Sequence, residues 1–190
     1  MKPVGPSASL PARQTTALRQ GRQSLAGAVY FVTFCTAHRQ PWLASPEARR
    51  SGAAVCHELT ASGDARMLAA TLMPDHVHLL FVLGDRLSLD RLVAKWKARV
   101  RPTPGSEAAW QANYFEHRLR SDESEEAYAW YVFMNPYRAG LVTVDEVWPG
   151  WWPHAESAWT FLALARSGPR PQPEWLDRYE ITVRRLVVGA

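Results

Sequence analysis

The sequence predicts an α+β fold with the ferredoxin-like split βαβ order: a four-stranded antiparallel sheet, helices on one face, and one further helix. Three observations lead to this prediction. Residues 28–36 alternate apolar and β-branched side chains, as a strand does. Two apolar runs flank Pro74-Asp75, as in a hairpin. Helical apolar spacing recurs between and after the strands, which gives the order β-α-β-β-α-β-α.

The first half of the domain contains one helix between strands. Residues 45–62 have a proline at their second position and apolar residues at helical spacing, so they are predicted to form a helix. The runs 66–73 and 76–83 are separated only by two turn-forming residues. They are therefore expected to pair as adjacent antiparallel strands.

The second half repeats the helix and strand alternation. Residues 87–100 place Leu89, Leu92, Val93 and Trp96 on one face, and the PTPG run at 102–105 ends that helix. A short strand is predicted over 114–119. A last helix is predicted over 121–134, where serine and acidic residues gather at its start.

The two ends of the chain lack this periodicity. Residues 1–25 have scattered prolines, glycines and basic residues, and are predicted to form a flexible basic arm. Residues 147–190 are expected to form an irregular C-terminal tail. The folded domain is accordingly placed at residues 26–146.

Charge favours an anionic partner. The net charge is +4, and residues 85–101 hold six basic against two acidic residues. The N-terminal 25 residues hold four basic residues and no acid. No run approaches the roughly 18 apolar residues of a membrane span, so no membrane partner is expected. Two cysteines fit a reducing compartment, and we expect a cytoplasmic protein.

The run MPDHVHLL at residues 73–80 contains the clearest chemical signal. Side chains alternate along a strand, so His76 and His78 point the same way, with Cα atoms about 7 Å apart. Such a pair can share one metal ion. A histidine-triad hydrolase would need histidine at position 80, and a metallo-β-lactamase-like site would need aspartate; the residue is Leu80.

A tyrosine-bearing stripe lies on the last predicted helix. Tyr128, Tyr131 and Asn135 share one helix face by their spacing. A tyrosine hydroxyl becomes a nucleophile when a metal or a base favours the phenolate. The amide oxygen of Asn135 suits a hard cation such as Mg²⁺ or Mn²⁺.

Four ordered motifs resemble a known family. They are YFVT (30–33), PDHVHLL (74–80), WQ with FEH (110–111 and 115–117), and Tyr131 followed by NPYRAGLV (135–142). Together these motifs resemble the REP-associated tyrosine transposases, which belong to the single-tyrosine HUH transposases. The resemblance covers roughly residues 28–155 and implies that residues 26–146 form an HUH catalytic domain.

The resemblance implies a role for each motif. His76 and His78 would be the metal ligands, Tyr131 the nucleophile, and Mg²⁺ or Mn²⁺ the cofactor. Related insertion-sequence transposases have glutamine four residues after the tyrosine as third ligand; Asn135 takes that position here. The DNA would be single-stranded and folded into hairpins at repetitive extragenic palindromes, cut through a 5′-phosphotyrosine intermediate. Relatives work as monomers or as homodimers.

Backbone phosphates would be bound by basic residues of the arm and the helices. We expect these contacts from Arg19, Arg22, Lys95, Lys97, Arg99, Arg101 and Arg138. Two other functions stay open at this point. One is a replication-initiator-like nickase with the same chemistry, and the other is a non-catalytic hairpin-DNA-binding regulator. A relaxase is disfavoured because its tyrosine usually precedes the histidines.

Overall fold

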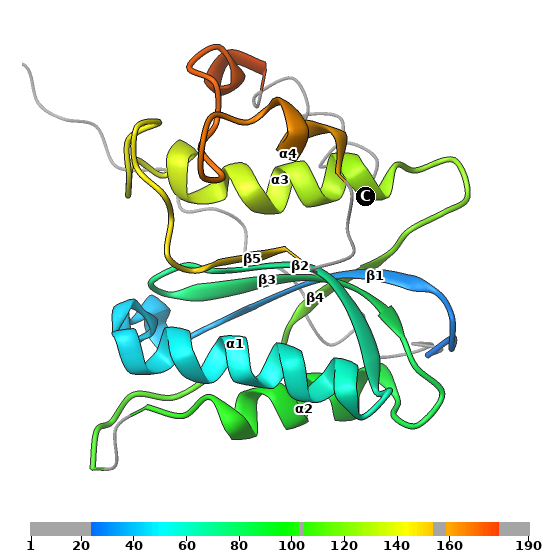
Figure 1. Cartoon of the computed structure of the whole chain (residues 1–190). Helices are drawn as coiled ribbons and strands as arrows, with labels where there is room; N and C mark the ends of the chain where they lie inside the picture. Colours follow the sequence, from blue (N-terminus) through cyan, green and yellow to red (C-terminus); the bar gives the residue numbers. More distant parts are fainter. Residues whose placement is uncertain (1–23, 103–104, 154–158, 179–190) are drawn as a thin grey trace, which may run out of the picture.

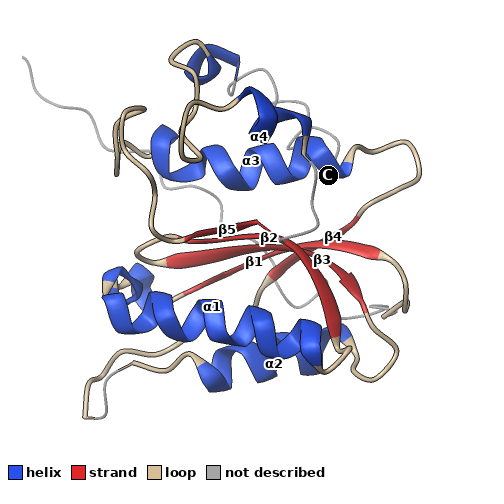
Figure 2. Ribbon diagram, viewed as in Figure 1, coloured by secondary structure: helices blue, strands red, loops and turns tan. Residues whose placement is uncertain are grey.

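The computed structural model describes residues 24–102, 105–153 and 159–178. A central sheet separates two helical layers, with α1 and α2 below it and α3 and α4 above it in Figures 1 and 2. The elements in chain order are β1 (Val29–Cys35), two short 3₁₀ turns (Ala37–Arg39 and Trp42–Ala44), α1 (Pro46–Ala61), β2 (Ala65–Leu72), β3 (His76–Leu83), α2 (Leu89–Arg99), β4 (Phe115–Arg118), α3 (Glu125–Arg138), β5 (Trp151–Pro153) and α4 (Thr160–Leu164).

The sheet confirms the predicted fold class and extends it by one strand. Its order is β4-β1-β3-β2-β5, and every neighbouring pair is antiparallel. The first four strands have the arrangement of the predicted split βαβ fold. The prediction of four strands was therefore one strand short, because β5 pairs with the outer edge of β2.

Strand β5 was missed because it is only three residues long and ends in proline. Pro153 has no N–H, which an outermost strand tolerates because that position need not donate to a neighbour. The Leu72 N–H donates to the carbonyl of Gly150 and fixes the approach of β5 to β2. A Cβ on Gly52 would lie 2.9 Å from the Trp152 ring, so the glycine in α1 makes room for this strand.

Helix α3 begins and ends four residues later than the predicted 121–134. Ser124, and not Ser121, is its N-cap, since its hydroxyl accepts from the Ala127 N–H. Pro136 lies inside the helix without ending it, and the chain leaves the helix at Gly140 with φ of 66°. The helix therefore includes Asn135, as its place on the tyrosine stripe requires, and also Arg138, which the sequence placed just past the helix.

One hydrophobic core lies between the sheet and the α1–α2 layer. The two helices are capped by the Ser45 and Ser88 hydroxyls. Trp96 of α2 is fully buried against the Phe34 ring, at 5.1 Å between centroids. Val77 of β3 belongs to this core. The intervening residue of the histidine pair therefore faces away from α3, as strand alternation requires.

A second core lies between the other face of the sheet, α3 and the segment that follows it. The Phe133 ring of α3 packs against the rings of Trp151, Phe161 and Trp175, with centroid separations of 5.2, 5.4 and 6.5 Å. Within the segment 147–190, which was expected to be an irregular tail, the structure forms β5 and α4, and Trp151 and Phe161 from these two elements are buried in this second core. The division of the chain at residues 26 and 146 stays a prediction, and the arm lies almost wholly outside the described residues. Among those described, no helix has the length and apolarity to cross a bilayer.

Replacing Phe161 by alanine tests this second core. We expect Phe161→Ala to lower the free energy of unfolding by about 3–5 kcal/mol, since it removes a buried ring between α4 and α3. Urea unfolding followed by tryptophan fluorescence measures the change. Leu164→Ala, in the same helix and 62% exposed, should change it by less than about 0.5 kcal/mol. Equal effects of the two substitutions would contradict the packing of α4.

Candidate metal and tyrosine site

His76 and His78 bring two ring nitrogens to one point above the sheet. Both lie on β3 and face α3, and their Nε2 atoms are 3.1 Å apart. The ring planes are nearly perpendicular, at 88°, with centroids 4.8 Å apart. The 3.1 Å separation is that expected of two neighbouring ligands on one ion, because metal–nitrogen bonds are about 2.1 Å long.

The outer nitrogen of each imidazole is held by a neighbouring side chain. His76 Nδ1 lies 2.6 Å from Asp75 Oδ1, and His78 Nδ1 lies 2.7 Å from Thr33 Oγ1. Thr33 is the direct partner of His78 in the β1–β3 register, which places its hydroxyl on the same face. Partners of this kind orient metal-binding histidines, and with both Nδ1 atoms engaged the two Nε2 atoms face the site.

Burial keeps both imidazoles neutral. Burial lowers the pKa of His78 well below 6.5, the nearby His76 lowers it further, and a hydrogen bond with Asn135 opposes the shift. Burial also lowers the pKa of His76, against the opposing effect of Asp75. Neutral imidazoles have the free lone pairs that metal ligation requires.

Helix α3 places Tyr131 and Asn135 over the histidines. The Tyr131 ring lies edge-on to His78, with centroids 5.6 Å apart, and equally close to Phe31. The Asn135 amide nitrogen donates to the Tyr131 carbonyl at 2.8 Å. Its side chain also interacts with the His78 imidazole, so the amide lies next to one of the two histidines.

The donor set fits a divalent cation. Thr71 lies opposite His78 in the β2–β3 register, and its fully buried hydroxyl has no hydrogen-bond partner among the described residues. An orphaned hydroxyl here is consistent with a site that holds an ion and its water. Within the described residues, no three or more His, Cys, Asp and Glu side chains gather for a metal. A third protein ligand would therefore be the Asn135 amide oxygen, as the sequence predicts.

The second tyrosine on α3 is held in a structural cluster. The Tyr128 hydroxyl donates to Glu123 at 3.0 Å, and its ring stacks on His117 with an 11° angle between planes. Burial and the Glu123 carboxylate raise the pKa of Tyr128. A raised pKa disfavours the phenolate, so Tyr128 is a poor candidate for a nucleophile.

Sequence analysis missed three residues that support the site: Thr33, Asp75 and Phe31. Phe31 stacks on His78 at 5.6 Å and 16°, and contacts both tyrosines of α3. The YFVT run contained the signal, because Phe31 and Thr33 are two residues apart and so share one face of β1. Only the strand register shows that this is the face of the sheet on which His78 lies.

The basic residues of α2 lie on the opposite side of the sheet from Tyr131 (Figure 1). Lys95 pairs with Asp64 at 2.8 Å and Glu58 at 3.1 Å, and Arg99 pairs with Glu58 at 2.9 Å. These acids come from outside α2, so charge counting along that helix did not detect them. Their role in DNA binding stays a prediction.

The remaining predicted phosphate contacts differ in position. Lys97 donates to the Gln111 carbonyl, and burial lowers its pKa to about 8. Arg101 donates to the Ala98 carbonyl at 2.6 Å. Arg138 is exposed and lies two helical turns from Tyr131, on the stripe that also carries Asn135. Arg19 and Arg22 lie outside the described residues.

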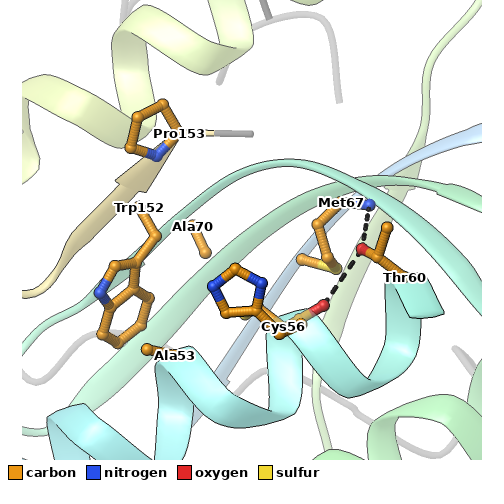
Figure 3. A pocket seen from close by; sticks show the side chains of 8 residues that line it. Ala53, Cys56, Thr60, Met67, Ala70, Trp152 and Pro153 are labelled. Atoms are coloured by element: carbon orange, nitrogen blue, oxygen red, sulfur yellow. Dashed lines mark hydrogen bonds between the residues drawn. The ribbon is translucent and has the colours of Figure 1, made fainter. Parts of the chain in front are cut away.

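A pocket of about 150 Å³ lies elsewhere, between α1, β2 and β5 (Figure 3). Ala53, Met67, Ala70, Trp152 and Pro153 give it a largely apolar lining. Burial raises the pKa of the Cys56 thiol in its wall to about 12. A thiol of that pKa stays protonated at neutral pH, so Cys56 is not a reactive nucleophile in this pocket.

Comparisons with known proteins identify the family of the chain. The family model described as "Transposase IS200 like" matches residues 24–133. The REP-associated tyrosine transposase of Escherichia coli (strain K12) is 27% identical over 86 residues, which are 43% of this chain and 50% of that protein. The chain thus spans about half the length of this curated relative.

Solved structures extend the likeness to the fold. A REP-associated tyrosine transposase bound to a REP hairpin matches with a TM-score of 0.60 and 20% identity, over 77% of this chain and 89% of that chain. A putative transposase from Deinococcus radiodurans matches with a TM-score of 0.41 and 18% identity, over 54% and 87%. The first match shows a shared fold, and the second is too weak to carry an argument. The family resemblance seen in the sequence is confirmed.

The buried His78 should make the metal-free protein sensitive to acid. Its folded pKa is below 6.5, so below that pH the unfolded chain takes up a proton that the folded chain does not. We expect the free energy of unfolding in excess chelator to fall as the pH drops from 6.5 toward the lowered pKa, and His78 to contribute nothing to this dependence above 6.5.

Urea unfolding in steps from about pH 7.5 to about pH 5 measures this dependence. His78→Gln should show a shallower decline than the wild type. His57→Gln, at an exposed position of α1, should keep the wild-type slope. If the free energy of unfolding of His78→Gln depends on pH as steeply as that of the wild type and of His57→Gln, the burial of a neutral His78 is refuted.

Proposed function

This chain belongs to the IS200-like transposase family, and we propose that it nicks and rejoins single-stranded hairpin DNA through a covalent bond to Tyr131. The observation that carries the proposal is the approach of α3 to β3. Helix α3 brings Tyr131, and strand β3 brings two neutral imidazoles whose Nε2 atoms converge. A nucleophile beside a cation site is the arrangement that metal-assisted phosphoryl transfer requires.

His76, His78 and the Asn135 amide oxygen would hold a divalent cation. When bound there, Mg²⁺ or Mn²⁺ would polarise a non-bridging oxygen of the scissile phosphate and stabilise the charge that develops during attack. Two imidazoles in the donor set favour Mn²⁺ over Mg²⁺, since Mg²⁺ prefers oxygen ligands.

The proposed step exchanges one phosphoester bond for another. The Tyr131 hydroxyl loses its proton and attacks phosphorus in line, and the bond from phosphorus to the 3′ oxygen breaks. The departing oxygen takes up a proton and becomes a free 3′-hydroxyl, while the 5′ side stays linked to the tyrosine. Reversal by another 3′-hydroxyl joins strands without an outside energy source.

Hairpin DNA is the substrate class that the relatives support. A similar solved structure is a REP-associated tyrosine transposase described as bound to a REP hairpin. In this chain, Arg138 on the Tyr131 stripe is well placed for a phosphate near the scissile bond. Arg19 and Arg22 of the arm, and Lys95, Lys97, Arg99 and Arg101 of α2, remain proposed backbone contacts.

Removing the Tyr131 hydroxyl should abolish the covalent intermediate. We expect wild-type protein, incubated with Mn²⁺ and single-stranded palindromic DNA labelled at its 3′ end, to form an adduct that survives denaturing electrophoresis. Tyr131→Phe should form none above background, because no other oxygen replaces the nucleophile.

Tyr128→Phe is the matched control for this loss. It removes a hydroxyl from the same helix, at a position bonded to Glu123 and not aimed at the histidines. Its adduct should remain within a few-fold of the wild type. An undiminished adduct with Tyr131→Phe would reject the nucleophile assignment. Hairpin binding without an adduct in the wild type would instead favour the non-catalytic regulator.

Removing the metal or one of its ligands should stop cleavage without preventing DNA binding. We expect excess chelator to abolish adduct formation and added Mn²⁺ to restore it. His76→Ala should raise the Mn²⁺ concentration for half-maximal cleavage at least about 10-fold, since an imidazole ligand is lost. Gel electrophoresis over a Mn²⁺ series, with hairpin binding measured separately, decides the matter. Normal cleavage by His76→Ala at low Mn²⁺ would refute its role as a ligand.

A further inference from the structure

We propose that Arg39 and Asp75 form a positioning pair that fixes the ring orientation and tautomer of His76. This inference rests on the proposed function, since the pair would prepare His76 Nε2 to bind a metal. Neither residue touches the phosphate or the nucleophile in the proposed step.

A continuous line of contacts leads from Arg39 to the metal-facing nitrogen. Arg39 Nε lies 2.9 Å from Asp75 Oδ2, and the other carboxylate oxygen lies 2.6 Å from His76 Nδ1. The same guanidinium donates through Nη1 to Cys35 Sγ at 2.8 Å. Cys35 is the register partner of His76 on β1, so the guanidinium is fixed at both ends beside the imidazole.

The backbone that carries Asp75 is fixed independently of its side chain. The Asp75 carbonyl accepts from both the N–H and the hydroxyl of Thr36, at 2.9 and 3.0 Å. The neighbouring Pro74 carbonyl accepts from the Leu43 N–H at 3.0 Å. The β2–β3 turn is thereby tied to the segment after β1, and the carboxylate has little freedom to leave His76.

The backbone of Arg39 is held in a conformation that its residue type disfavours. His38 and Arg39 have φ of 53° and 56°, in the left-handed region that side chains other than glycine rarely adopt. Such strain persists where surrounding contacts over-determine it, and it concentrates near functional sites. This double left-handed turn folds the Arg39 side chain back toward Asp75, and the ion pair is the contact that it makes possible.

The pair contributes orientation more than stability. The side chains of Arg39 and Asp75 are 53% and 24% exposed, and ion pairs so accessible to water stabilise a fold weakly. The hydrogen bond to His76 has a definite direction, however. A carboxylate can only accept, so His76 must carry its proton on Nδ1 and leave the Nε2 lone pair free.

His78 lacks a constraint of this kind, which makes the role of Asp75 specific. Its partner Thr33 has a hydroxyl, and a hydroxyl can donate or accept, so either tautomer of His78 is satisfied. In the metal-free protein, His78 can donate from Nε2 to His76 Nε2 across 3.1 Å. Asp75 thus determines which of the two facing nitrogens is always an acceptor.

Nitrogen NMR of the imidazole rings tests this assignment in metal-free protein. We expect wild-type His76 to be a single Nδ1–H tautomer. Asp75→Ala should give a mixture of tautomers, and Asp75→Asn should restore the Nδ1–H form in part, because the amide oxygen still accepts. Glu47→Gln removes an acid from the exposed Glu47–Arg50 pair and should leave His76 unchanged. A single Nδ1–H tautomer in Asp75→Ala would overturn the inference.

Mn²⁺ affinity, measured by the electron paramagnetic resonance of the free ion, gives the second readout. Asp75→Ala should bind Mn²⁺ about 10–100-fold more weakly, and Arg39→Gln should lose affinity less strongly. His38→Gly relaxes the same turn but keeps the ion pair, and should bind as the wild type does. Unchanged affinity in Asp75→Ala would also reject the positioning role. Failure of the wild type to bind Mn²⁺ would refute the proposed metal site, while the NMR result would still decide the tautomer.

Discussion

Strand β3 is hydrogen-bonded to β1 on one side and to β2 on the other, and this double pairing determines the rest of the site. Because side chains alternate along a strand, the pairing commits His76 and His78 to one face and Val77 to the core below. The same register places Thr33 and Thr71 on either side of His78. A shift by one residue would send both imidazoles into the α1–α2 core and leave no site.

Packing of α3 against that face provides the second half of the chemistry. Phe133, buried among the rings of Trp151, Phe161 and Trp175, anchors the helix from the side away from the histidines. Phe31 joins the two halves, since its ring contacts both His78 and Tyr131. The orientation of the tyrosine therefore depends on aromatic packing that extends well beyond the residues proposed to react.

The number of basic residues along α2 overstates the positive charge that this helix could offer to DNA. The basic run on α2 is real, yet Lys95 and Arg99 are paired with Asp64 and Glu58 from other elements. Asp64 is buried, whereas the pairs with Glu58 are partly exposed and add little stability. All three pairs lower the net positive field that a phosphate would meet. Arg138 differs, because the helix carrying Tyr131 also brings it to the side of the proposed chemistry.

The sequence by itself determined the strand order, the histidine pair and the stripe of Tyr131 with Asn135, because local periodicity sets which side chains share a face. It did not reveal β5, the packed segment after α3 or the true ends of that helix; those depend on an edge partner and on burial. It also could not show that Thr33 and Asp75 contact the Nδ1 atoms of His78 and His76, or that the Tyr128 hydroxyl donates to Glu123. Thr33 and His78 lie on different strands, and only the strand register brings them within hydrogen-bonding distance. Asp75 and Glu123 are close to their partners in the chain, but the directions of their side chains depend on the folded turn before β3 and on the start of α3.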